Sequence, residues 1–284
     1  MKIGIVTDST SDLPQELVSK YNIEVIPLNV SMDNQNYRDG VDLTSTEFYQ
    51  KLKFSSSLPT TSQPSPGVFA EVYHTLLKKV DAVLSIHLSE ALSGTIQAAR
   101  MAREILPEAN IWVIDSKSTS MGLGGLVVEA ARAVGRGMKI DEVGKLVESL
   151  RERIHFLVTL DTLEYIRKGG RVSALQAFVG SILQIKPLLK LVHGKVELVE
   201  RVRTRREAIG KLLNEFKTQL TSETIEMIAV MHTVAEEEAE KLKASIKEIF
   251  KNAEIIVNQA GPVLGTHVGP GALALISIPK VSSV

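Results

Sequence analysis

The sequence predicts an α/β protein in two parts: a three-layer α/β/α domain with a mainly parallel sheet, then an α+β domain with a mixed or antiparallel sheet. Short apolar runs alternate with helical patterns as far as about Arg153, which is typical of a parallel sheet covered by helices. After about His155, two strand-like runs flank His193-Gly194, a pair that suits a hairpin turn. Because 284 residues can form two hydrophobic cores, we expect domains over 1–155 and 156–284.

The first part contains the clearest boundaries between elements. Pro14 suits the first position of a helix, and Thr44 with Glu47 forms a capping-box pattern. Pro27 interrupts the second apolar run and indicates an edge strand or an irregular path. We expect strands over 2–6, 24–30, 82–88 and 111–116, a polar loop over 55–67, and helices over 14–17, 44–54, 68–80, 95–106, 124–135 and 141–153.

The second part mixes hairpin strands with helices. We expect strands over 156–160, 187–192, 195–202, 225–231, 254–258 and 272–278, and helices over 161–166, 173–184, 205–220 and 236–250. The stretch over 261–271, ahead of the last strand, is rich in glycine and proline.

The composition excludes several function classes. Lys plus Arg (33) balance Asp plus Glu (33), so the overall charge does not favour nucleic acid or an anionic membrane surface as a partner. The absence of cysteine removes disulfides, thiol nucleophiles and zinc–thiolate sites, which fits an intracellular protein. No apolar run approaches the ~20 residues of a membrane span. The apolar run at the N-terminus is too short for a signal peptide. We therefore expect a cytoplasmic protein without stable membrane insertion.

The turn Ser93-Gly94-Thr95 is the best candidate for an anion site. It follows the buried run over 82–88 and opens a helical pattern, so its backbone N–H groups lie at a helix N-terminus. In an open α/β fold, ligands bind at this edge of the sheet. The same residues could merely cap the helix, and the spacing leaves the two interpretations nearly even. The glycine slightly favours the close approach of a ligand.

Three other polar clusters have weaker support. Asp8-Ser9-Thr10-Ser11 could bind phosphate, but capping is the favoured interpretation for Asp and Ser ahead of a helix. The stretch Thr60-Thr61-Ser62-Gln63 lies in a loop containing three prolines, which is either a solvated loop or a rigid recognition loop. His267 lies among glycines and prolines and is either a buried structural histidine or a residue that faces a ligand.

Several familiar sites are absent from the sequence. There is no Gly-x-Gly-x-x-Gly, no P-loop, no His-Glu-x-x-His and no Gly-x-Ser-x-Gly, so nucleotide, zinc and ordinary hydrolase motifs are missing. Ser93 and His267 could act as nucleophile and base in a serine-dependent acyl hydrolase or transferase. No acidic residue that would orient the histidine can be identified from the sequence, so this alternative is the weaker one.

Five motifs, in order, resemble the DegV family over essentially the full length of the chain. They are Thr7-Asp8-Ser9, Thr61-Ser62-Gln63-Pro64, Leu92-Ser93-Gly94-Thr95, Arg167-Lys168-Gly169-Gly170-Arg171 and Gly265-Thr266-His267-Val268-Gly269-Pro270-Gly271. The resemblance implies a protein that buries one long-chain fatty acid between its two domains. It further implies the fatty-acid-binding subunit of a bacterial fatty acid kinase, which presents the carboxylate to a separate ATP-dependent kinase subunit and does not itself catalyse the phosphorylation.

The resemblance also implies roles for individual residues. Thr61 and Ser93 are similar to the carboxylate donors of the family, with His267 beside them as a hydrogen-bonding or catalytic group. Arg171 resembles a position near the head group or the kinase-facing surface. The remaining ligand-binding residues expected from the motifs are Ser62, Gly94, Thr95 and Thr266. No metal and no cofactor other than the bound fatty acid is expected.

Overall fold

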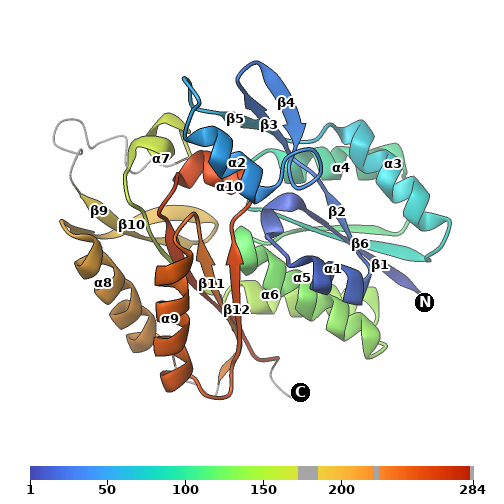
Figure 1. The fold of residues 1–284 in the computed structure, drawn as a ribbon. Helices are drawn as coiled ribbons and strands as arrows, with labels where there is room; N and C mark the ends of the chain where they lie inside the picture. Colours follow the sequence, from blue (N-terminus) through green and yellow to red (C-terminus); the bar gives the residue numbers. More distant parts are fainter. Residues whose placement is uncertain (172–184, 221–223, 282–284) are drawn as a thin grey trace.

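The computed structural model describes residues 1–171, 185–220 and 224–281 and contains two large sheets and one small one (Figure 1). One large sheet is built from the first part of the chain and the other from the second part. The predicted fold class, an α/β protein with a parallel sheet and a mixed sheet, is confirmed. The helix expected over 173–184 lies outside the described residues.

The first large sheet has four parallel strands in the order β2-β1-β6-β7. Helices α3 and α4 pack on one face around Phe69 and Tyr73, and helices α5 and α6 pack on the other around Leu84 and Ile86, which gives three layers. The elements are β1 (Ile3–Asp8), β2 (Ile23–Ile26), β6 (Ala82–His87), β7 (Ile111–Asp115), α3 (Pro66–Leu77), α4 (Thr95–Ile105), α5 (Ser120–Gly135) and α6 (Ile140–Arg151).

The second large sheet has six strands in the order β10-β9-β8-β13-β11-β12, and only β11 and β12 are parallel. His193 and Gly194 both have positive φ (48° and 80°), as a two-residue hairpin turn requires, so the predicted hairpin is confirmed. The elements are β8 (His155–Thr159), α7 (Glu164–Lys168), β9 (Lys186–Val192), β10 (Lys195–Val202), α8 (Arg205–Thr218), β11 (Ile225–His232), α9 (Glu236–Ile249), β12 (Glu254–Gln259) and β13 (Leu273–Pro279).

A small antiparallel sheet, β4-β3-β5, was not expected from the sequence. The single strand predicted over 24–30 is wrong, because Pro27 lacks the N–H group that would continue the ladder of β2. After Pro27, β3 pairs with β4 and β5 and does not join the parallel sheet. The predicted loop over 55–67 likewise contains β5. The elements are β3 (Asn29–Met32), β4 (Gln35–Arg38), β5 (Thr60–Ser62), α1 (Gln15–Tyr21) and α2 (Ser45–Leu52).

The second unexpected element is α10 (Pro262–Val268), in the glycine- and proline-rich stretch. The first residue of α10 is a proline, which suits a helix start. Gly265 in its middle has low helix propensity, so the sequence does not indicate a helix here. Helix α5 also begins at Ser120, ahead of the predicted Gly124, because Ser120 to Gly125 are all buried and packing outweighs the low helix propensity of glycine.

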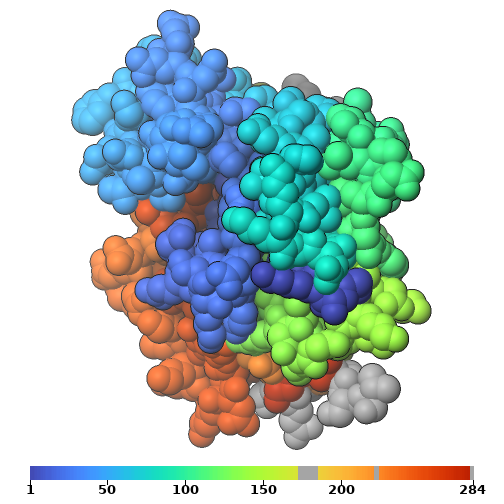
Figure 2. Space-filling model, turned by 90° about the vertical axis from the view of Figure 1, so that its right-hand side faces the viewer, coloured from blue at the N-terminus to red at the C-terminus, as the bar shows by residue number. Residues whose placement is uncertain are grey.

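The two parts of the chain pack against each other through α5 and α10. Helix α5 lies between the two large sheets, with Met121 and Val128 in one cluster with β11 and β13. Helix α10, from the second part, packs against α2 and β3 of the first (Figure 1). On the face in Figure 2, blue N-terminal segments lie directly against orange C-terminal ones. Within the described ranges, no helix is long and apolar enough to cross a membrane.

The contact between α10 and α2 gives a first prediction. A Cβ atom on Gly265 would lie 2.6 Å from the Tyr49 hydroxyl and 2.7 Å from the Phe48 ring. Overpacking of a buried contact costs about 1–3 kcal/mol, so Gly265→Ala is expected to lower the thermal unfolding midpoint by several degrees. The control is Gly210→Ala in α8, where nothing lies within 4 Å and alanine is expected to be neutral or stabilising. Equal midpoints for the two variants would contradict this account of the contact.

Candidate ligand-binding site

A cavity of about 290 Å³ lies where β5, the loop before α4, α10 and Arg171 meet. We call it the His267 cavity. Its polar residues are Thr61, Ser62, Gln63, Ser93, Thr119, Arg171 and His267, together with the backbone of Gly94, and its apolar residues include Leu28, Leu88, Leu92, Val263, Leu264 and Val268. The cavity therefore has polar groups from both parts of the chain beside an apolar wall.

His267 and Thr61 form the central polar contact of this cavity. The Thr61 Oγ1 atom lies 2.8 Å from His267 Nε2, although the two residues are 206 positions apart. Burial and the nearby Arg171 lower the pKa of His267 to about 4, so the ring is neutral at pH 7. The His267 Nδ1 atom is buried with no hydrogen-bond partner in the described residues.

This arrangement selects one tautomer of the ring. A buried N–H without a partner is rarer in proteins than a buried acceptor without one. The proton therefore belongs on Nε2, from which it is donated to Thr61 Oγ1. The hydroxyl of Thr61 is then free to donate its own proton into the cavity.

Ser93 lies at the N-terminal end of α4, as predicted. Its Oγ atom accepts a hydrogen bond from Thr95 N at 3.2 Å and lies 2.9 Å from Thr95 Oγ1. The Ser93 side chain thus closes a turn just ahead of α4, whose N-cap is Gly94 and has no side-chain capping hydrogen bond, and it also lines the cavity. A Cβ atom on Gly94 would lie 2.6 Å from the Gln63 side-chain amide, so the glycine leaves room for the Gln63 side chain in this position.

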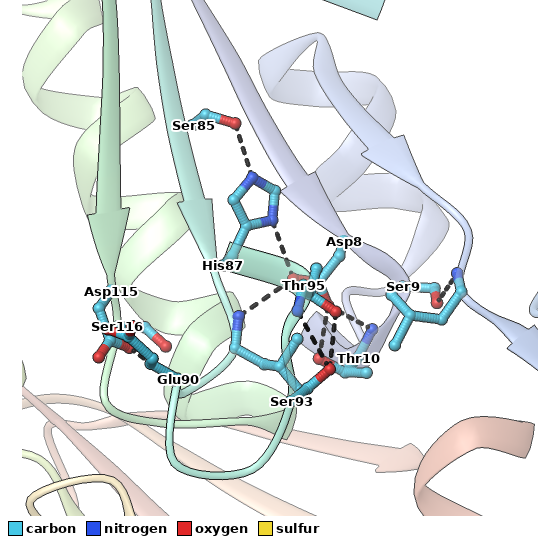
Figure 3. Close-up of polar contacts among 12 residues, drawn as sticks. Asp8, Ser9, Thr10, Ser85, His87, Glu90, Ser93, Thr95, Asp115 and Ser116 are labelled. Carbon is cyan, nitrogen blue, oxygen red and sulfur yellow. Dashed lines mark hydrogen bonds and ion pairs between the residues drawn. The ribbon is translucent and has the colours of Figure 1, made fainter. Parts of the chain in front are cut away.

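A buried chain of polar residues supports this edge of the sheet (Figure 3). The His87 Nδ1 atom donates to Asp8 Oδ2 at 3.0 Å, and His87 Nε2 lies 2.6 Å from Ser85 Oγ, which accepts from the Tyr73 hydroxyl. Asp8 also accepts from Leu88 N and Thr10 N. Asp8 thus caps the turn after β1, which confirms the capping interpretation, and it joins that turn to the start of the loop carrying Ser93.

Most of the predicted site residues converge, and two do not. Thr61, Ser62, Ser93, Gly94, Arg171 and His267 all line the cavity. Thr95 is buried behind Ser93, and the Thr266 hydroxyl donates to the Pro262 carbonyl within α10 at 2.9 Å, so neither side chain lines the cavity. Two further residues line the cavity: Gln63, which belongs to the possible recognition loop but was not among the predicted ligand-binding residues, and Thr119. Gln63 lies in a quoted motif, whereas Thr119 had no sequence signal.

A second cavity, of about 90 Å³, adjoins the first. We call it the Ala274 cavity. The two share the side chains of Thr119, Ile166, Val196, Leu264 and Val268. Its other walls are mainly apolar and come from the second sheet, with Val158, Leu160, Leu189, Met231, Ala272 and Ala274 among them. A cavity with polar groups and an apolar cavity therefore lie side by side, with the five shared residues between them.

The geometry does not favour a serine nucleophile. A general base must lie within hydrogen-bond reach of the proton that it removes. Here His267 Nε2 contacts Thr61, and the Ser93 hydroxyl contacts Thr95. In the part of the chain that the structure describes, no group of three or more His, Cys, Asp or Glu residues is placed to hold a metal ion.

Two buried carboxylates hold the start of α10, behind the cavity. Asp12 accepts hydrogen bonds from Ser120 Oγ at 2.6 Å and from Gly261 N at 2.9 Å, and Asp39 interacts with Ser9 and Val263 N. Burial raises the pKa of Asp12 to about 7 and that of Asp39 to about 6, and the hydrogen bonds only partly oppose this. This pair therefore links the turn after β1 to the helix that carries His267.

The raised pKa of Asp12 predicts a pH-dependent stability. The folded state holds the proton more tightly than the unfolded state, so this stabilisation is complete below about pH 4 and is lost as the pH rises through about 7. His267 has the opposite effect on the pH dependence of stability. Because burial lowers the pKa of His267 to about 4, the folded protein becomes more stable as the pH rises from about 4 to 6.5. The difference between the wild type and Asp12→Asn isolates the first effect.

We therefore expect Asp12→Asn to become more stable relative to the wild type between pH 5 and pH 8, as measured by chemical denaturation at each pH. The control Asp33→Asn changes an exposed carboxylate and should show no such trend. A constant difference between the wild type and Asp12→Asn across this range would show that Asp12 does not titrate as described.

Comparisons with known proteins identify the family. The family model described as "Uncharacterised protein, DegV family" matches residues 2–280. The chain belongs to the DegV family. A DegV domain-containing protein of Caldanaerobacter subterraneus is 37% identical over 271 residues, covering 95% of this chain and 96% of that protein.

Solved structures of DegV proteins have the same fold. A fatty-acid-binding DegV family protein from Thermus thermophilus is 36% identical, with a TM-score of 0.90 over 99% of this chain and 100% of that one. DegV from Bacillus subtilis, described as a fatty acid binding protein, is 33% identical with a TM-score of 0.92 over the same shares of the two chains. The expected family is therefore confirmed.

Proposed function

We propose that this DegV protein binds one long-chain fatty acid, with the carboxylate in the His267 cavity and the acyl chain in the Ala274 cavity. The observation that carries the proposal is that a cavity with hydroxyl donors and an apolar cavity lie next to each other and share five lining residues. The DegV structures from Thermus thermophilus and Bacillus subtilis, both described as fatty acid binding, support it.

The carboxylate is held by hydroxyl donors and one cation. His267 donates to Thr61, so the Thr61 hydroxyl donates to the ligand. The Ser93 hydroxyl has the same role when both Thr95 N and Thr95 Oγ1 donate to its oxygen, since its own proton is then directed to the ligand. The exposed Arg171 adds positive charge at the mouth of the cavity. Hydrogen bonds to a charged group contribute about 1.5–3 kcal/mol each, so the two hydroxyls supply roughly 3–6 kcal/mol.

The acyl chain supplies more of the binding free energy than the head group. Burial of a methylene contributes about 0.8 kcal/mol, and about a dozen of them contribute on the order of 10 kcal/mol before the costs of association. The head-group residues therefore mainly set the orientation of the ligand. Replacing either Thr61 or Ser93 is expected to leave a protein that still binds fatty acid but presents its carboxylate poorly.

We further propose that a cytoplasmic ATP-dependent kinase subunit phosphorylates the presented carboxylate, and that the ligand lies between domains 1–155 and 156–284. Arg171 is exposed beside the cavity, as a residue that meets a partner must be. In this scheme the DegV protein is a carrier, and the partner supplies the catalysis.

His267→Ala tests the proposed presentation. Because His267 directs the Thr61 hydroxyl, its loss should lower acyl phosphate formation by the partner kinase about tenfold or more, while lipid binding falls much less. The measurement pairs the yield of acyl phosphate with the amount of bound fatty acid. The control His74→Ala alters an exposed histidine on α3 and should change neither. Unchanged acyl phosphate formation by His267→Ala would refute this role.

A further inference from the structure

A third cavity, of about 520 Å³, lies at the start of α10. We call it the Asp39 cavity. Its lining residues come from the turn after β1, helices α1 and α2, strand β2, the loop after β4 and the segment that joins β12 to α10. Among the described residues, none of those that line it also lines the His267 cavity or the Ala274 cavity. The Asp39 cavity is therefore separate from the proposed fatty acid site.

The walls of this cavity carry negative charge. Asp12, Glu24 and Asp39 line it, and there is no Lys, Arg or His among its described lining residues. The whole chain has 33 basic and 33 acidic residues, so the cavity is a local excess of negative charge in a neutral protein. Such a cavity attracts cations. Its remaining polar groups are neutral and belong to Ser9, Ser11, Gln15, Ser45, Asn258 and Gln259.

Two of the three carboxylates are buried, and one of these has an oxygen without a hydrogen-bond partner. Asp12 and Asp39 are only 8% and 4% exposed, whereas Glu24 is exposed. Both oxygens of Asp12 accept hydrogen bonds, from Gly261 N and from Ser120 Oγ. The Asp39 Oδ2 atom is buried and has no partner in the described part of the chain. Because buried charges are normally paired or bind a metal ion, a cation at Asp39 would supply the missing partner.

The two buried carboxylates face the same side of Gly261. A Cβ atom on Gly261 would lie 3.3 Å from Asp12 Oδ1, 3.3 Å from Asp39 Oδ1 and 3.6 Å from Asp39 Oδ2. The glycine places no side chain between the two carboxylates. One small cation beside Gly261 can therefore contact both of them, either directly or through a bound water.

We propose that the Asp39 cavity binds a small cation through the carboxylates of Asp12 and Asp39. Two kinds of cation have the required chemistry. A Mg²⁺ ion is commonly held by one or two carboxylates while it keeps several waters, for which this cavity has room. The primary ammonium group of a small molecule donates up to three hydrogen bonds, which suits carboxylate oxygens. Either cation ties the turn after β1 to the start of α10, and its binding does not require a fatty acid.

The experiment measures the affinity of the full chain for MgCl₂, CaCl₂ and butylamine hydrochloride by isothermal titration calorimetry. It is done at pH 8, where both carboxylates are mostly ionised. The thermal unfolding midpoint is followed with the same salts, because a ligand that binds only the folded state raises it. Tetramethylammonium chloride at equal ionic strength is the control salt, since its bulky cation has no N–H donor. We expect the wild type to bind at least one of the three probes and not the control salt.

Asp39→Asn and Asp12→Asn are each expected to weaken this binding at least about tenfold, because each removes the charge of one of the two carboxylates. Asp33→Asn removes an exposed carboxylate outside the cavity and should leave the affinity unchanged. Asp39→Asn alone decides the question if Asp12→Asn does not fold. Binding of a metal salt identifies a metal site, and binding of butylamine alone identifies a site for an organic amine. If the wild type binds none of the probes, or if the folded variants bind them as the wild type does, the cation site is refuted.

Discussion

Leu264→Trp is expected to weaken fatty acid binding by at least about 100-fold. Leu264 lines both cavities at their junction, on helix α10. An indole at this position closes the passage, so the part of the acyl chain beyond it can no longer be buried. Loss of only four methylenes at about 0.8 kcal/mol each corresponds to roughly a 200-fold loss of affinity. Equilibrium binding of a long-chain fatty acid measures the effect.

A matched control separates closure of the pocket from a general effect of tryptophan. Ile105→Trp makes a similar change at an exposed position on α4 and should bind as the wild type does. Val268→Trp narrows the same junction from the next turn of α10 and should behave as Leu264→Trp does. Wild-type affinity in both folded junction variants would mean that the acyl chain does not pass between the two cavities.

Thr61→Val is expected to weaken the binding of a fatty acid by about 10- to 100-fold, a smaller loss than that from closing the passage. The change keeps the side-chain shape but removes the donor to the carboxylate and leaves the buried N–H of His267 without its partner. Loss of a hydrogen bond to a charged group costs about 1.5–3 kcal/mol, which accounts for the expected loss of affinity. The unpaired N–H of His267 is present with and without the ligand, so it mainly lowers the stability of the protein. The affinity for the corresponding fatty alcohol, which carries no charge, should change less.

Thr60→Val is the control for this prediction. Thr60 neighbours Thr61 on β5, but its side chain points to the opposite face and does not line the cavity. It should leave both affinities unchanged. An equal loss for acid and alcohol in Thr61→Val would show that Thr61 shapes the cavity without recognising the carboxylate.

The sequence predicts the architecture and the polar end of the site well, because both follow from local patterns. Alternating apolar runs predict the parallel sheet, and the hydroxyl-rich turn before α4 indicates where its edge can bind an anion. The side chains of Ser93 and His267 then lie in one cavity, as the resemblance to the DegV family implies. The capping role of Asp8 also follows from its position ahead of a helical turn.

The parts that could not be predicted depend on contacts between distant residues. Helix α10 forms in a stretch of low helix propensity because its face packs against Phe48 and Tyr49 of α2. The apolar end of the pocket is lined by residues of β8, β11 and β13 that are typical of any buried sheet. Only the register, which sets Ala274 between Val158 and Met231, shows that they enclose a cavity.

Native mass spectrometry of the purified protein tests the central claim most directly. We predict a mass increase equal to one intact long-chain fatty acid, which is lost when the protein is denatured and is absent from Leu264→Trp. A protein that carries no fatty acid, even after incubation with one, would contradict the account. A covalent acyl group on Ser93 would contradict it as well and would indicate an acyl-transfer enzyme.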